Sequence, residues 1–122
     1  MKNNIVKNIA KELDIAFIDL EPFGFAENDI GLPINEVQRL ISVLKDECIP
    51  ILGGDIIIIE HNELDVTCCG WSCDITKPFS RFVEYSYNKT KQYINNYIQI
   101  NKEELDSVYV DIVVFSGSNI NV

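Results

Sequence analysis

Histidine and cysteine, the side chains most often used as catalytic bases, nucleophiles and zinc ligands, are few in this chain. The chain has one histidine, His61, and four cysteines, Cys48, Cys68, Cys69 and Cys73. Thiolates and an imidazole suggest zinc, but Cys68 and Cys69 are adjacent and would point to opposite faces of a strand, unlike paired zinc-ligand spacings. No serine or cysteine forms a recognisable nucleophile motif with His61. We therefore predict no metal, no cofactor and no catalytic residue, and interpret His61 as a solvated turn residue.

The segment Gly53-Gly54-Asp55 invites comparison with the glycine-glycine-acid signature of cyclic-dinucleotide synthases. That signature continues with Glu-Phe, whereas this chain continues with Ile56-Ile57, and the glycine spacings that cradle phosphates are absent. Two glycines between apolar strand segments more simply indicate a bulge or a close approach of another element to the backbone. Acid pairs such as Glu103 and Glu104 are common on acidic surfaces and do not predict a hydrolase.

The elements that must position these residues are read from hydrophobic periodicity. In order, we expect a strand at 16–20, a loop at 21–33, a helix at 34–47, an extended piece at 49–52, a strand at 55–60, a turn at 61–62, a strand at 64–69, a loop at 70–78, a helix at 79–98 and a strand at 108–115. We expect about 12 N-terminal and about 7 C-terminal residues to be frayed. The order β-α-β-β-α-β predicts an α+β fold with two helices packed on a mainly antiparallel sheet.

Both predicted helices have an apolar face at helical spacing. The first face consists of Val37, Leu40, Ile41, Leu44 and Cys48. The second consists of Phe79, Phe82, Val83, Ser86, Thr90, Tyr93, Ile94 and Tyr97. The strand Ile56–Ile59 is apolar on both faces, which predicts a place in the middle of the sheet or at an interface with a second subunit.

Length and charge limit the possible functions. At 122 residues the chain fits one domain, 1–122, and no apolar run is long enough to span a bilayer. A net charge of −9 disfavours nucleic acid and anionic membrane as partners. The acids are uneven, because residues 12–36 and 46–76 contain no Lys or Arg. Two interpretations fit this pattern: a solvated surface, or a negative face for a basic partner. With no secretory signal visible, we expect a cytoplasmic protein with reduced cysteines.

Several short motifs together resemble one protein family. The run Ile49–Ile56, which contains Gly53-Gly54-Asp55, is followed by Gly70-Trp71-Ser72-Cys73-Asp74 and by a helix that opens Phe79-Ser80-Arg81-Phe82-Val83. This arrangement, over about residues 30–98, resembles the immunity protein 40 family of bacterial polymorphic toxin systems. The resemblance implies an antidote that binds and neutralises a cognate toxin. Gly70 departs from the family pattern, where a polar residue is expected, and Cys68-Cys69 lie outside it.

The candidate toxin-binding residues are Trp71, Tyr85, Glu60, Glu63 and Asp65. Trp71 fits either a core aromatic or an exposed anchor, and Tyr85 fits either ordinary surface or an interface contact. Glu60, Glu63 and Asp65 flank the predicted hairpin turn, where charge is presented openly. The alternatives to an immunity protein are a generic protein-binding or homodimerising module and, less favoured, a small metal-dependent enzyme.

Overall fold

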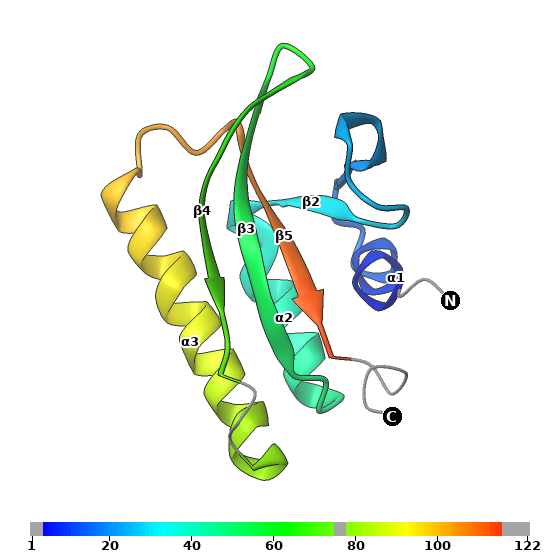
Figure 1. Ribbon diagram of the computed structural model, residues 1–122, viewed down its shortest axis with the longest axis vertical. Coiled ribbons are helices and arrows are strands. Elements are labelled where there is room, and N and C mark those ends of the chain that lie inside the picture. Colours follow the sequence, from blue (N-terminus) through cyan, green and yellow to red (C-terminus); the bar gives the residue numbers. More distant parts are fainter. Residues whose placement is uncertain (1–3, 75–77, 116–122) are drawn as a thin grey trace.

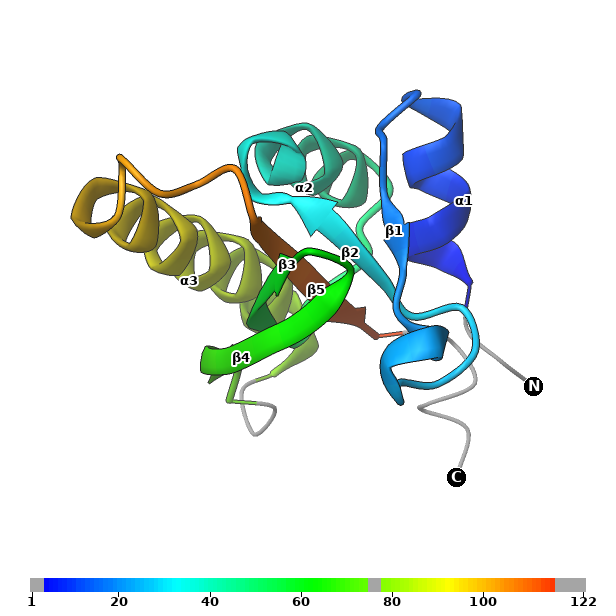
Figure 2. The same ribbon diagram turned by 90° about the horizontal axis from the view of Figure 1, so that it is seen from above.

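Within residues 4–74 and 78–115, which the computed structural model describes, the chain forms three α-helices, two short 3-10 helices and five strands. In chain order they are α1 (Ile5–Glu12), β1 (Ile18–Asp19), η1 (Glu21–Phe23), β2 (Ile30–Pro33), η2 (Ile34–Glu36), α2 (Val37–Asp46), β3 (Ile51–Glu60), β4 (Glu63–Ser72), α3 (Phe79–Ile100) and β5 (Val108–Val114). Every strand pair is antiparallel, in the order β1-β2-β5-β3-β4. The three helices cover one face of this sheet (Figures 1 and 2). The predicted α+β class is confirmed.

The last strand, β5, occupies the centre of the sheet, between β2 and β3. The predicted interior position of Ile56–Ile59 is correct, because β3 lies between β5 and β4. Ile56 packs in the main core beneath the helices, whereas Ile57 and Ile59 form a second small core with Leu20 on the other face. Both faces of the apolar strand are therefore covered within one chain, and the strand gives no reason to require a second subunit.

Two N-terminal predictions are wrong. Residues 5–12 are not frayed but form α1, which buries Val6, Ile9 and Ala10 in the main core. Part of the predicted loop at 21–33 is the strand β2, which pairs with both β1 and β5. The predicted fraying of residues 116–122 lies outside the described residues.

The two long strands extend further than predicted. β3 runs without a break from Ile51 through Gly53 and Gly54, where the register against β5 shifts between Ile51 and Gly53. β4 continues to Ser72 and pairs Trp71 with Gly54, so the motif segments at 53–55 and 70–72 lie side by side on neighbouring strands. The predicted loop is thereby shortened at its beginning, and residues 75–77 lie outside the described part.

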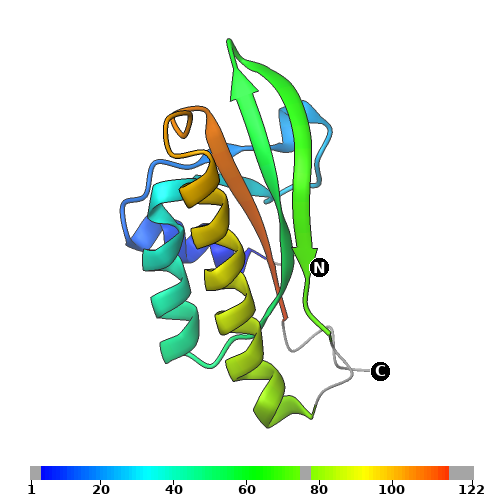
Figure 3. The same ribbon diagram turned by 90° about the vertical axis from the view of Figure 1, so that its left-hand side faces the viewer.

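The helices α2 and α3 pack next to each other on the sheet (Figure 3). The predicted apolar face of α2 is buried except at Cys48, because α2 ends at Asp46 and Cys48 adopts a left-handed conformation with φ 57°. The amide of Ile49 then donates to the carbonyl of Leu44, and that of Cys48 to Lys45, as in a Schellman cap. Cys48 is exposed.

The buried face of α3 differs slightly from the predicted apolar face. Phe82, Ser86, Thr90 and Ile94 are buried as expected, but Tyr87 is buried as well. Its hydroxyl lies 2.9 Å from the carbonyl oxygens of both Leu44 and Ile49, and burial is the largest cause of a rise in the Tyr87 pKa to about 12. Tyr87 therefore ties α3 to the end of α2.

Candidate functional site

Trp71 is a packing residue in the structure. Its side chain is only 8% exposed, its indole Nε1 donates to Thr90 Oγ1 at 3.0 Å, and its ring stacks on Tyr93 at 5.0 Å between centroids. A Cβ on Gly54 would lie 2.5 Å from Trp71 Cη2. The second glycine of the motif thus makes room for the indole, and the tryptophan offers little surface to a partner.

The other motif residues hold the end of β4 against α3. The amide of Cys73 donates to the carbonyl of Leu52 at 2.9 Å, and the amide of Asp74 donates to the Tyr85 hydroxyl at 3.2 Å. Lys89 Nζ donates to the carbonyl of Ser72 at 2.6 Å. Burial raises the pKa of the Cys73 thiol, although Lys89 and Thr90 oppose the rise. Tyr85 is half-buried in this network, and its described contacts are internal.

The glycines at positions 53 and 70 each leave room for a neighbouring strand. A Cβ on Gly53 would collide with the Trp71 carbonyl oxygen, and one on Gly70 would lie 2.5 Å from Asp55 Oδ1. Gly70 faces Asp55 across the β3–β4 ladder. A Cβ at position 70 would also lie 2.9 Å from the Gly54 carbonyl oxygen, so the close approach of β3 gives this position a steric reason for glycine.

The β3–β4 hairpin exposes acids as predicted from its turn. His61 and Asn62 form the turn with φ 54° and 63°, and both are exposed, as are Glu60 and Glu63. Glu60 and Glu63 are directly opposite each other, an arrangement of like charges that destabilises a hairpin. Asp65 lies at a register irregularity in β4, and its side chain is outside the described part of the chain.

The connection from α3 to β5 adds more acids at the same end of the molecule. Exposed Glu104 and Asp106 share with Glu60 a hollow of about 400 Å³. We define the hairpin surface by its exposed acids: Glu60, Glu63, Glu103, Glu104 and Asp106. None of them forms an ion pair with another described residue, and the segment contributes one base, Lys102. The hairpin surface is therefore a negative, unneutralised end of the fold.

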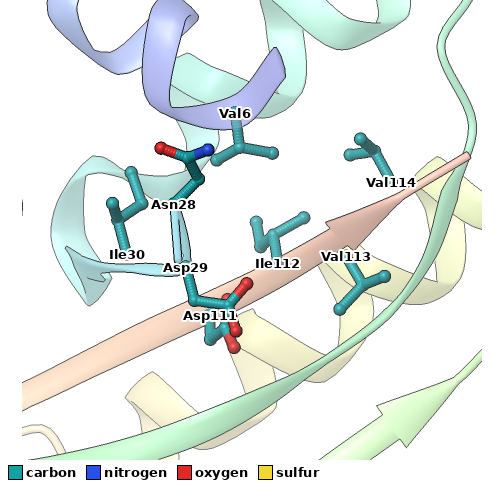
Figure 4. Close-up of a pocket in the computed structure, with 8 residues that line it drawn as sticks. All are labelled: Val6, Asn28, Asp29, Ile30, Asp111, Ile112, Val113 and Val114. Atoms are coloured by element: carbon teal, nitrogen blue, oxygen red, sulfur yellow. The ribbon is translucent and has the colours of Figure 1, made fainter. Parts of the chain in front are cut away.

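A second group of acids escaped the sequence prediction. Asp111 lies in the central strand β5 directly opposite Asp55 of β3, and it lines a hollow of about 80 Å³ together with Asp29 (Figure 4). Asp111 is 7% exposed. Burial, followed by the charges of Asp29 and Asp55, raises the pKa of the Asp111 carboxyl to about 7. The sequence does mark Asp111 as unusual, because it interrupts the apolar run Val108–Val114.

No metal-binding cluster is found among the residues that the structure describes. Among the residues with described positions, no three His, Cys, Asp or Glu side chains lie close enough to hold a metal ion. The side chain of Cys68, one of the ligands considered for zinc, lies outside that set, while Cys48 and Cys73 are free thiols. No helix in the described part has the length and apolar character needed to cross a membrane.

Comparison with known proteins decides the family. The immunity protein 40 family matches residues 19–114, a range that includes β2, β3, β4 and β5 and the last residue of β1. The chain belongs to the immunity protein 40 family. No curated protein and no solved structure matches it. Membership of this family implies an immunity role. Two of the motifs that suggested the family, Gly-Gly-Asp and Trp-x-Cys-Asp, lie next to each other where β3 pairs with the end of β4.

Proposed function

We propose that the protein binds a cognate bacterial toxin and neutralises it by protein–protein contact, without chemistry of its own. The observation that carries this proposal is the match to the immunity protein 40 family over residues 19–114. Antidotes need a rigid complementary surface, and acidic surfaces steer basic partners at rates well above those of neutral encounters. We further propose that it acts in the cytoplasm, a reducing compartment in which free thiols such as Cys48 and Cys73 persist.

The hairpin surface is the proposed point of first contact with the toxin. Its acids are exposed and lack ion-pair partners among the described residues, so their field is not neutralised locally. We include Asp65 in this contact on the strength of its place beside the turn. Trp71 and Tyr85, by contrast, are proposed to stabilise the β4–α3 junction that supports the fold, because their described contacts are internal.

The test is co-expression of the protein with the product of the neighbouring gene, followed by pull-down and measurement of growth. Binding together with restored growth is the expected result. Absence of both binding and protection would contradict the proposed function and leave a generic binding module as the better interpretation.

Charge reversal tests the proposed surface. Glu60→Lys with Glu63→Lys should lower the association rate by about tenfold at low salt, and by less at high salt. The matched control is Asp46→Lys with Glu47→Lys, the same charge change on exposed residues at the end of α2, where the chain turns toward the start of β3 at the opposite end from the hairpin (Figure 1). Equal slowing by both double variants would show that net charge, and not the hairpin, governs association.

A further inference from the structure

Asp111 is an unusual residue for the centre of a sheet. It is 7% exposed, yet no described hydrogen bond or ion pair involves its carboxyl group. Buried carboxylates are normally paired, because an unpaired buried charge is costly. No fully buried side-chain oxygen or nitrogen among the described residues lacks a partner, so the Asp111 carboxyl retains access to solvent. The group is thus nearly enclosed, unpaired and reachable.

The surroundings of Asp111 add negative charge and no described counter-charge. Asp55 is directly opposite it on β3, and Asp29 lies across the small hollow, with one oxygen accepting the Ala26 amide at 3.1 Å. Figure 4 shows the carboxyl groups of Asp29 and Asp111 next to each other where the segment before β2 meets β5. We call Asp29, Asp55 and Asp111 the three-aspartate site.

The place in the fold suits an incoming side chain. In the described part of the chain, β2 pairs with β5 only through Leu32 and Pro33. The hollow lies next to this pairing, along the C-terminal half of β5. Its volume of about 80 Å³ is several times what one water molecule requires. Val113, 48% exposed, lies on its rim and offers apolar contact beside the charge.

We propose that the three-aspartate site binds an arginine side chain of the partner protein, an inference that rests on the proposed function. A guanidinium presents five donors in a planar fork and is weakly hydrated. These properties suit the nearly enclosed Asp111 carboxyl, which has the more exposed carboxyls of Asp29 and Asp55 nearby. A metal ion fits less well, since no three acidic, His or Cys side chains in the described part are grouped closely enough to hold one. From Asp55 to Glu60 is about 17 Å along β3, so one partner with a standard interface of about 800 Å² covers both this site and the hairpin surface.

The test measures affinity for the neighbouring gene product that wild type binds in the co-expression assay. Asp111→Asn keeps the shape and removes the charge, and it should weaken binding by about 30-fold or more at pH 8. The matched control is Asp46→Asn, which removes one exposed acid at the end of α2 and should change the affinity less than threefold. Asp29→Asn should weaken binding in the same direction as Asp111→Asn, by a smaller factor.

The pH dependence provides a second readout. Below pH 7, protonation of Asp111 competes with the arginine, so wild-type affinity should fall by up to about tenfold per pH unit. Asp111→Asn should remove this dependence, whereas His61→Gln, which removes the chain's one histidine, should retain it. In the complex, the Asp111 carboxyl should titrate below its value in the free protein, as followed by carbon NMR.

Failure of the proposed toxin neutralisation can be distinguished from failure of the arginine site. If wild type neither binds nor protects, the proposed function fails. If wild type binds and protects but Asp111→Asn binds equally well at pH 8, the arginine site alone is overturned. An ordinary carboxyl pKa in the free protein would also overturn it, because Asp111 would then be well solvated or already neutralised, and would not be a desolvated site for a guanidinium. Calcium binding to the free protein that shifts the Asp111 resonance at submillimolar concentration would assign the site to a metal ion.

Discussion

Replacing Asp111 with asparagine should stabilise the free protein, and by an amount that depends on pH. The pKa of the carboxyl is raised from 3.8 to about 7 by burial and by Asp29 and Asp55. In the unfolded chain the group ionises near its ordinary value, so between these two values the native state holds more protons than the unfolded state. Stability therefore falls as pH rises through this window, and the full penalty is present above pH 7. The shift of about 3 units corresponds to about 4 kcal/mol.

The measurement is urea unfolding of wild type and Asp111→Asn at pH 5, 6, 7 and 8, followed by fluorescence of Trp71, the chain's one tryptophan. The stability difference between the two proteins should grow by about 1.4 kcal/mol per pH unit up to pH 7 and then level off. Groups common to both proteins largely cancel in this difference. Asp46→Asn, the exposed control, should show no such trend. A difference that stays constant from pH 5 to 8 would refute the reasoning, since it would mean that Asp111 is ionised in the native state throughout.

Other substitutions test the packing by the same unfolding experiment. Gly54→Ala should destabilise by about 3 kcal/mol, because its Cβ would meet the Trp71 ring and the Asp111 carbonyl, whereas Gly24→Ala, with φ +98° but nothing within 4 Å, should cost only about 1 kcal/mol. Equal losses would show that small shifts of the Trp71 ring and of β5 accommodate the added methyl group, so that close packing does not require glycine at position 54. Cys48→Gly should stabilise by about 0.5–1 kcal/mol by relieving the left-handed φ of 57° at the end of α2, and a loss of stability would contradict that account of the cap.

The parts of the fold that were predicted are those specified by local periodicity. The helix expected at 79–98 is α3 at Phe79–Ile100, and the helix expected at 34–47 contains α2. Each presents a continuous apolar face, so local sequence and tertiary packing agree. The hairpin turn was also predictable, because His61-Asn62 separates two strand-like runs. Glu60 and Glu63 were placed correctly on the surface for the same reason.

The missed elements depend on contacts with distant residues. α1 has eight residues and no side-chain hydrogen bond at its N-cap, so it is marginal alone and exists by burying Val6 and Ile9. β2 contains Gly31 and Pro33, which locally indicate a loop. A Cβ at position 31 would lie only 3.1 Å from the Tyr109 Cβ on β5, a strand almost eighty residues later, so glycine here eases a close contact between strands. No local pattern contains that information.

The three-aspartate site has one feature that the local sequence shows and one that depends on contacts between distant residues. Asp111 was visible as an acid in an apolar strand, but its neighbours come together only because β5 inserts between β2 and β3. The two sequence stretches rich in acids and free of bases, 12–36 and 46–76, supply Asp29 and Asp55, so the insertion concentrates charge that the sequence shows only as two separate stretches. A sheet built for stability alone would hold an apolar residue or a paired group at position 111. A free carboxyl at that position destabilises the unbound protein but gives a cationic partner a site that is already desolvated and oriented, which is how a fold exchanges stability for affinity.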